Sequence, residues 1–459
     1  MTPSSQASTS AAAAEGALAL RIVEGAAEGR AQVLRREPLA EPTLPEALVR
    51  SIEELWGEPL SAREHVARII AEVRREGDAA VTRLSQRFDG SAYTTIEVSA
   101  EEFAAAADQV PRAQRDALEF AAERVRHYHR TQLRHGPTSF SERGTGMVVR
   151  PIRSAGIYMT GNEAALPSSV IHTAVPGAVA GVPELIGVTA ARADGSVNPL
   201  KLVAARAAGI RRVFRASGAQ ALAALAFGTE TIPRVDKIFG PGGVFVTLAK
   251  QQLFGQVGID AIYGPTETLV LADESAAPDL CAADLLAQAE HDVLATPVLI
   301  TTSRALADAV AAEVERQLDG LERAEVARAA IARGGAVVAA DLDEALALAN
   351  EFAPEHLCLL TRDPGALVGR VQNAGGVFVG ESSPEVLGDY TAGPSHVMPT
   401  GGSARFASPL SVLDFLKVIS TVALDDADLR RLGPFAADLA RAEGLTAHAR
   451  SIERRLEGR

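Results

Sequence analysis

Cysteine is nearly absent from this sequence: Cys281 and Cys358 are the only two among 459 residues. Two cysteines cannot build a disulfide framework or a cysteine-rich zinc module, and a reducing compartment suits such a chain best. We predict that both are buried as small hydrophobic residues, which is the usual environment of free cysteine.

Long apolar runs and clusters of basic residues are also missing. No stretch free of charge and proline reaches the roughly 18 apolar residues that a membrane helix needs. The N-terminal segment MTPSSQASTSAAAAEG has no basic region, so it does not resemble a signal peptide. Because the formal net charge is −13 and no basic patch is present, nucleic acid and anionic membranes are not expected as partners. A cytoplasmic globular protein is expected.

The chain is long enough for two or three domains. Residues 1–20 are small and polar and are predicted to form a disordered tail. After residue 147, short β-rich runs alternate with Ala-rich helical segments, and a second such cycle begins at Thr268. This alternation is typical of βαβ units and a parallel sheet. The fold class is therefore predicted to be α/β, with two doubly wound, Rossmann-like domains.

The glycine fingerprint of dinucleotide-binding domains, G-x-G-x-x-G, is absent. The nearest loop, Gly240-Pro241-Gly242-Gly243, lacks the third glycine at the required offset. A redox function therefore does not follow from the fold class alone.

Four side chains form a candidate metal-binding set. Gln288 and His291 lie three residues apart near the end of a helix predicted over residues 278–291, so both should leave the same helical face. Asp389 lies in a Gly- and Pro-marked loop, and His448 lies in the terminal helical region. Nitrogen and oxygen ligands without sulfur suit zinc or a similar divalent cation. Taken singly, each side chain also fits a structural or solvent-exposed role.

A carboxylate adjacent to an imidazole forms the candidate catalytic pair. Glu355 and His356 follow a predicted helix and begin a predicted strand. Histidine has an ordinary pKa near 6.5, which suits a general base. The alternative is a surface glutamate beside a structural histidine.

These motifs together resemble the signature of the histidinol dehydrogenase family. The segments that carry the resemblance occur in the family's order between about residue 45 and residue 459: Ile259-Asp260, Gly264-Pro265-Thr266-Glu267, Gln288-Ala289-Glu290-His291, Ala353-Pro354-Glu355-His356, Gly388-Asp389-Tyr390, Ser395-His396-Val397 and Glu443 to His448. The resemblance implies a four-electron oxidation of L-histidinol to L-histidine through L-histidinaldehyde, the last step of histidine biosynthesis, with two NAD⁺ reduced in turn.

The resemblance also implies a role for each candidate residue. One zinc ion per subunit would hold the substrate, bound by Gln288, His291, Asp389 and His448. His356 would take protons from the alcohol and the hydrate, and Glu355 would activate water. The substrate-contacting positions would be Thr266, Gln288, His291, His356, Asp389, His396, Glu443 and His448.

Family members are homodimers with intertwined termini, which implies that Glu443 and His448 serve the neighbouring subunit. The chain is expected to divide into two α/β domains with an extension at each end. The first domain, over 54–157 plus 268–410, would carry the catalytic and metal residues, and the second, over 158–267, would lie on the cofactor side. The N-terminal extension would cover 21–53, and a C-terminal helical dimerisation segment, broken at Gly433-Pro434, would cover 411–459.

The cofactor positions match the family less closely. Tyr158, Gln220 and Gly243 stand where the family contacts NAD. The family pattern Tyr-x-Pro-Gly-Gly is replaced by Tyr158-Met159-Thr160-Gly161-Asn162, and Gly243 replaces the Asn of Gly-Pro-Gly-Asn. The loss of one polar contact is worth about 1 kcal/mol of cofactor affinity.

Three other functions are compatible with parts of the sequence. One is a paralogue of the same fold that oxidises another polar amino alcohol or diol with NAD, although Glu443, His396 and the metal positions suit histidinol. Another is a zinc-dependent hydrolase that uses Glu355 as base without a nicotinamide. The third is a non-catalytic relative, which the altered cofactor loops would explain.

Overall fold

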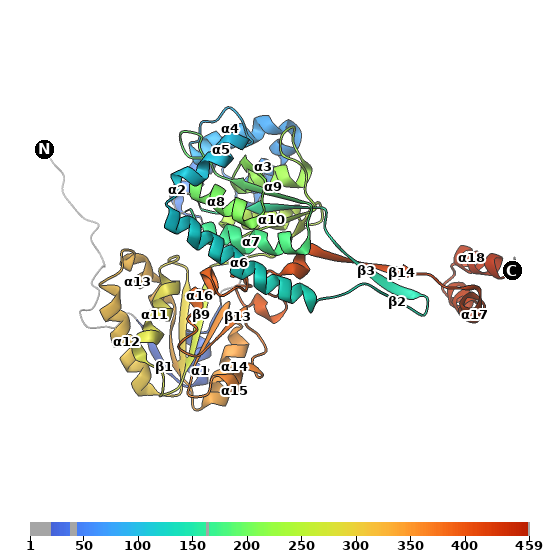
Figure 1. Cartoon of the computed structure of the whole chain (residues 1–459). Helices are drawn as coiled ribbons and strands as arrows, with labels where there is room; N and C mark the ends of the chain where they lie inside the picture. The colour runs from blue at the N-terminus through green and yellow to red at the C-terminus, as the bar shows by residue number, and fades with distance from the viewer. Residues whose placement is uncertain (1–19, 37–43, 162–164, 458–459) are drawn as a thin grey trace.

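The computed structural model describes residues 20–36, 44–161 and 165–457. Two α/β bodies lie one above the other, and an arm extends from one side (Figure 1). The predicted mixed α/β class with parallel sheets is confirmed. Most of the expected disordered tail, residues 1–19, lies outside the described residues.

The first body is built on sheet A, whose neighbouring strands all pair in parallel. Its six strands, in spatial order, are β1 (Ile22–Glu24), β11 (Gly335–Val338), β10 (Thr296–Thr301), β9 (Glu267–Ala272), β12 (His356–Leu360) and β13 (Gly376–Val379). The residues of β9 are buried throughout, which is typical of a parallel strand covered on both faces.

Helices cover both faces of sheet A. One face carries α11 (Pro278–Ala289), α12 (Arg304–Leu318) and α13 (Ala324–Arg333), and the other carries α1 (Ala26–Gln32), α14 (Leu342–Phe352) and α15 (Gly365–Val368). The short helix α16 (Glu385–Tyr390) packs beside α11. Cys281 and Cys358 are buried in this body, as predicted.

The second body is built on sheet B, also parallel throughout. Its five strands, in spatial order, are β6 (Arg212–Arg215), β5 (Glu184–Thr189), β4 (Ser154–Tyr158), β7 (Lys237–Phe239) and β8 (Gly258–Ile259). One face carries α6 (Arg112–Arg134), α7 (Pro167–Ala180) and α8 (Pro199–Ala208), and the other carries α3 (Ala62–Glu76), α4 (Asp78–Asp89), α9 (Gly218–Phe227) and α10 (Val244–Leu253).

The remaining short helices connect these elements. They are α2 (Glu46–Trp56), α5 (Ala100–Ala105) and the 3₁₀ helices η1 (Ala106–Gln109), η2 (Ser403–Arg405) and η3 (Val412–Phe415).

The structure corrects the expected domain division, because residues 54–157 do not join residues 268–410. The apolar face of α3, with Val66, Ile69 and Val73, is buried in the same core as Phe214 of sheet B. Helix α6 packs against α7 and α8 on the opposite face of that sheet. Periodicity shows that a helix has an apolar face, but it does not show which sheet the face covers. The N-terminal extension also differs from expectation in part, since β1 is an edge strand of sheet A.

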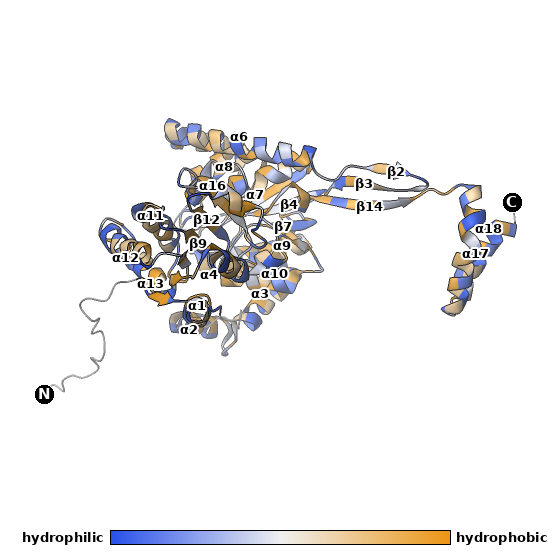
Figure 2. Cartoon of the chain, turned by 90° about the horizontal axis from the view of Figure 1, so that it is seen from below, coloured by the Kyte–Doolittle hydropathy of each residue, from blue (hydrophilic) through white to orange (hydrophobic). Residues whose placement is uncertain are grey.

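The C-terminal segment 411–459 is not helical throughout, which is a second correction. Residues Leu416–Val422 form β14, which pairs antiparallel with β3 (Thr145–Pro151), and β3 pairs with β2 (Phe140–Glu142). These three strands form the arm. Figure 2 shows the arm and the two helices beyond it, α17 (Asp426–Ala442) and α18 (Thr446–Glu457), standing clear of both bodies.

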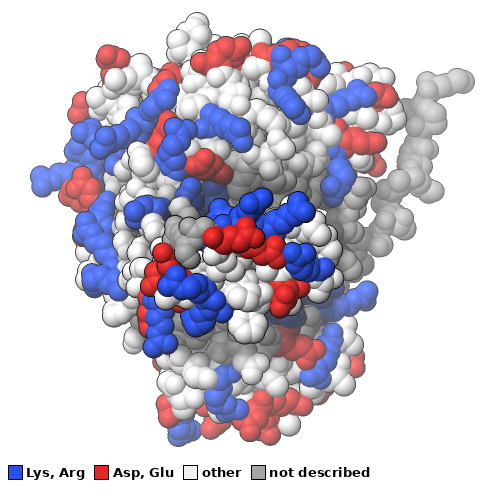
Figure 3. Space-filling model, turned by 90° about the vertical axis from the view of Figure 1, so that its right-hand side faces the viewer, with Lys and Arg blue, Asp and Glu red and all other residues white. Residues whose placement is uncertain are grey.

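Gly433-Pro434 does not break α17 as expected, because Pro434 lies within the helix. A Cβ atom added at Gly433 would lie 3.1 Å from Ile452, so the glycine lets α18 pack closely against α17. No helix in the described part of the chain is both long and apolar enough to cross a bilayer. Acidic and basic side chains are interspersed over the face that Figure 3 shows.

Candidate active site

The candidate catalytic residues lie where β9 and β12 begin. Helix α14 ends at Phe352, its capping residue Ala353 has a left-handed φ of 52°, and Pro354 then leads directly into Glu355 and His356. Since His356 pairs in register with Thr268, the start of β12 lies beside Thr266 and Glu267. The site is therefore at the amino edge of sheet A, although ligands of α/β sheets usually bind at the carboxyl edge.

Glu355 is held by two donors from the neighbouring strand. Its Oε2 accepts hydrogen bonds from the Thr266 hydroxyl at 2.6 Å and from the Glu267 backbone N–H at 3.1 Å. Burial raises the pKa of Glu355 to about 7, and the nearby His356 opposes that rise. A carboxyl group with a pKa near neutrality can both take and return a proton under ordinary conditions.

His356 is buried and has one engaged and one free ring nitrogen. Its Nδ1 lies 3.1 Å from the Glu267 carbonyl oxygen, to which it donates, so Nε2 carries the lone pair in the neutral ring. Nε2 has no hydrogen-bond partner and lies 3.8 Å from Asp389 Oδ1. Burial lowers the pKa of His356, but Glu355 and Asp389 outweigh burial and raise it to about 9. The site therefore stabilises the protonated ring that forms when His356 accepts a proton.

The two candidate ligands of α11 lie in different environments. Gln288 is buried, its Oε1 lies 2.9 Å from the Thr266 hydroxyl, and its Nε2 lies 3.4 Å from His356 Nδ1. His291 does not lie on the helix as expected, because α11 ends at Ala289 and the His291 N–H turns back to the Gln288 carbonyl at 3.2 Å. His291 is exposed. The relative positions of the Gln288 and His291 side chains are therefore determined by the turn after α11, and not by a shared helical face.

Asp389 and His396 complete the cluster around His356. Asp389 Oδ1 lies 3.8 Å from His356 Nε2 and 3.8 Å from His396 Nδ1. Burial raises the pKa of Asp389, but His356, His396 and His291 outweigh burial, so the net pKa lies below its usual value. The carboxylate form, which is the form that binds a cation, is therefore favoured. His396 Nδ1 donates to the Asp389 carbonyl at 2.8 Å, which leaves its Nε2 available to a ligand.

A residue that the sequence did not single out, His172 of α7, supports His396 from the other body. Its ring stacks on the His396 ring at 4.3 Å between centroids, with an interplanar angle of 10°. His172 Nδ1 accepts the His396 backbone N–H at 3.2 Å, and its Nε2 lies 3.4 Å from the Tyr390 carbonyl. His172 lies in a predicted helix without any motif around it, so no local signal could have identified this contact.

Glu443 and His448 do not join this cluster within one chain. Glu443 directly follows α17 and His448 lies in α18, both residues are exposed, and both helices stand beyond the arm (Figure 1). Across residues 20–36, 44–161 and 165–457, no three His, Cys, Asp or Glu side chains of this single chain gather into a metal site. The four-residue metal set is therefore incomplete within one chain.

The three candidate cofactor residues line one cavity at the carboxyl edge of sheet B. Tyr158 ends β4, Gln220 lies in the first turn of α9, and Gly243 precedes α10; together they border a volume of about 430 Å³. Burial raises the pKa of Tyr158 to about 12, and its hydroxyl oxygen accepts the Gly218 N–H at 3.1 Å. Gln220 is buried, yet its Nε2 has no hydrogen-bond partner.

A buried ion pair fixes the loop that precedes Gly243. Lys250 Nζ lies 2.6 Å from Asp260 Oδ1, and Asp260 Oδ2 accepts the Gly240 N–H at 2.7 Å. Lys250 also donates to the Gly240 carbonyl at 2.5 Å. A Cβ atom added at Gly243 would meet no atom within 4 Å, so the altered position leaves open space on the cavity wall.

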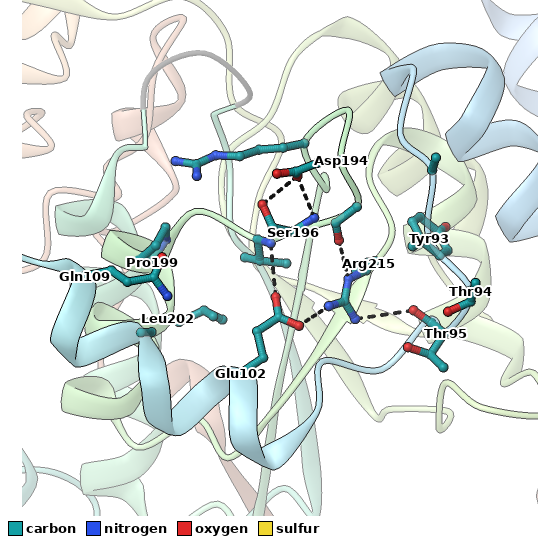
Figure 4. A pocket seen from close by; sticks show the side chains of 15 residues that line it. Tyr93, Thr94, Thr95, Glu102, Gln109, Asp194, Ser196, Pro199, Leu202 and Arg215 are labelled. Atoms are coloured by element: carbon teal, nitrogen blue, oxygen red, sulfur yellow. Dashed lines mark hydrogen bonds and ion pairs between the residues drawn. The ribbon is translucent and has the colours of Figure 1, made fainter.

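Another cavity, of about 470 Å³, lies beside sheet B near Arg215, Glu102 and Ser196 (Figure 4). The Arg215 guanidinium is already engaged by Glu102 and by the carbonyls of Gly195, Thr95 and Glu97. None of the candidate catalytic, metal or cofactor residues lines this cavity.

Known proteins resemble this chain over most of its length. The family model for histidinol dehydrogenase matches residues 58–456. Histidinol dehydrogenase from Deinococcus radiodurans is 51% identical over 442 residues, covering 95% of this chain and 100% of that protein. The enzyme from Thermus thermophilus is 48% identical over 435 residues, with coverage of 95% and 100%.

A solved structure agrees over the same length. The crystal structure of histidinol dehydrogenase from Elizabethkingia anophelis matches with a TM-score of 0.87 and 31% sequence identity, covering 97% of this chain and 99% of that chain. The order of the motifs, the matched length and the common fold lead to one conclusion: this chain belongs to the histidinol dehydrogenase family.

Proposed function

We propose that this chain is a zinc- and NAD-dependent histidinol dehydrogenase that oxidises L-histidinol to L-histidine through L-histidinaldehyde. The observation that carries the proposal is the convergence of Glu355, His356, Gln288 and Asp389 in one cluster, to which the start of β12 and the helices α11 and α16 contribute. This oxidation needs a group that takes a proton from the alcohol and a group that takes a proton from water, and an imidazole and a carboxyl group can serve in these roles.

The donor set fits a zinc ion that also binds substrate. Gln288, His291 and Asp389 of one subunit would hold the ion together with His448 of the partner subunit. They supply oxygen and nitrogen donors, as zinc prefers, and a neutral amide is a weak ligand that leaves room for substrate atoms. Bound zinc would supply a Lewis acid that holds the imidazole and amino nitrogens of histidinol.

The cavity at the edge of sheet B fits a dinucleotide. Gln220 offers a buried amide without a partner, and α9 and α10 both begin at the cavity. Helix N-termini favour phosphate groups, because their first N–H groups are unpaired. Bound NAD⁺ would supply the hydride acceptor, and Tyr158, Gln220 and Gly243 would line its site.

The chain's own residues account for the proton transfers. His356 Nε2 takes the hydroxyl proton of the alcohol as hydride leaves the same carbon, which gives the aldehyde. Glu355, held by Thr266, removes a proton from the water that adds to the aldehyde carbon. After His356 has released its first proton to solvent, it takes a hydroxyl proton of the hydrate as the second hydride leaves. The products are the carboxylate, two NADH and the released protons.

A homodimer with intertwined termini would complete each site. Val422, Phe435 and Leu439 on β14 and α17 are 73%, 72% and 66% exposed in the single chain. Large exposed apolar side chains on a projecting arm and on the helix beyond it are typical of an oligomer interface. Such a dimer would bring Glu443 and His448 of the partner subunit to the cluster around His356.

The test is NAD⁺ reduction by zinc-loaded protein, with limiting L-histidinol compared with other amino alcohols and diols. We expect two NADH for each histidinol and little reduction with the other substrates. A preference for another alcohol would support the paralogue instead. A protein that reduces no NAD⁺ with any alcohol is not a dehydrogenase, and a zinc-dependent hydrolase would then be the better proposal.

A further inference from the structure

The backbone of Glu267 is the common support of both proposed catalytic side chains. Its N–H donates to Glu355 Oε2 at 3.1 Å, and its carbonyl accepts from His356 Nδ1 at 3.1 Å. Any movement of this one residue would therefore displace the carboxylate and the imidazole together. The contacts that fix Glu267 therefore matter for the chemistry, although its backbone, not its side chain, makes the two hydrogen bonds.

The Glu267 side chain is buried and pairs with an arginine from the distant N-terminal segment. Arg36 donates from Nη1 to Glu267 Oε1, and the two side chains are only 20% and 8% exposed. Glu267 Oε2 has no hydrogen-bond partner. Arg36 is thus the one side chain in the described structure that forms an ion pair with this carboxylate.

Arg36 also contacts the end of α14, the helix that precedes Glu355. Its Nη2 donates to the carbonyls of Phe352 at 2.5 Å and Ala353 at 3.4 Å, and its guanidinium carbon lies 3.9 Å from the centroid of the Phe352 ring. Ala353 adopts the left-handed conformation two residues before Glu355. One guanidinium therefore connects the start of β9 with the turn that leads into β12.

We propose that Arg36 is a positioning residue for the dehydrogenase reaction. By linking Glu267 to the end of α14, Arg36 acts as a clamp that fixes the relative positions of Glu355 and His356. The proposal rests on the proposed catalytic roles of those two residues. Arg36 itself touches neither of them and takes no part in proton transfer. Burial, and secondarily the charge of Arg405, lower the pKa of Arg36 to about 10, so the clamp remains charged near neutral pH.

The first experiment separates positioning from substrate binding. In Arg36→Ala we expect kcat for histidinol oxidation to fall on the order of tenfold to hundredfold, since a misplacement of about 1 Å can cost that much. The KM for histidinol and the zinc content should stay within about twofold, because the proposed metal ligands lie elsewhere. Arg36→Lys and added guanidinium ion should each restore part of kcat.

Arg30→Ala is the matched control. Arg30 lies in the same N-terminal segment and pairs with exposed Glu351 at 2.7 Å, but it has no contact with Glu267. Its loss should leave kcat unchanged. If Arg30→Ala lowers kcat as much as Arg36→Ala does, the N-terminal segment acts through general stability and the proposal fails.

A double-mutant cycle tests whether the clamp acts through Glu267. Removing Arg36 in a Glu267→Ala background should lower kcat by less than about threefold, because paired residues are not additive. Equal effects of Arg36→Ala in both backgrounds, or a loss confined to KM, would overturn the proposal. Full activity of Glu355→Gln and His356→Ala would instead overturn the proposed function, so the two failures are distinguishable.

Discussion

Replacing His356 with alanine is expected to lower kcat for histidinol oxidation by about 10³-fold or more, with zinc still bound. A positioned general base contributes typically about 10²–10⁴-fold, and this one would act at both hydride steps. Zinc should remain, because His356 is not among the proposed ligands and its Nδ1 is engaged by the Glu267 carbonyl. Steady-state NADH formation and zinc analysis of the purified variant are the measurements.

A second variant distinguishes the loss of the base from destabilisation caused by removing a buried ring. His356→Asn can still donate to the Glu267 carbonyl but cannot accept a proton at neutral pH, so it should fold well and remain inactive. His127→Ala, which removes a histidine from exposed helix surface, should be fully active. A His356→Asn protein that keeps a tenth of wild-type kcat would show that another group is the base.

Replacing Glu355 with glutamine is expected to spare the first hydride transfer and to slow the second by about 10²-fold or more. Only the second oxidation consumes water, and an amide cannot take a proton from it. The amide oxygen can still accept the hydrogen bonds of Thr266 and Glu267, so the geometry should be kept. Single-turnover kinetics should show one fast NADH per site, followed by a slow phase.

The control for this variant is Glu351→Gln, which neutralises an exposed carboxylate at the end of α14, four residues before Glu355. It should show two NADH at the wild-type rate. If Glu355→Gln slows both hydride steps equally, Glu355 does not act specifically on water, and the role given to it here is wrong.

Local sequence signals predicted the chemical types in the site but not their neighbours. A carboxylate beside an imidazole after a helix singled out Glu355 and His356 as candidates; β12 begins at His356, and Glu355 directly precedes it. The support of Glu355 by Thr266, 89 residues away, is created by the pairing of β9 with β12. The pairing of two distant strands cannot be predicted from the sequence of either segment alone.

Long-range packing also explains what sequence reasoning missed. His172 and Arg36 lie in segments without motifs. Their partners, His396 and Glu267, are 224 and 231 residues away in the sequence. The sheet that α3 covers could not be predicted for the same reason. The metal set remains a prediction, because Gln288 and Asp389 lie in the cluster while His448 stands beyond the arm.

Heterodimers of two inactive subunits test most directly whether the site is completed across a dimer. His356→Ala and His448→Ala subunits carrying different tags would be co-expressed, and the mixed dimer isolated through both tags. If His448 serves the partner subunit, one of the two sites regains every residue, and symmetry predicts about half of wild-type activity. If His448 serves its own subunit, both sites stay defective, and a mixed dimer as inactive as either parent would contradict the account.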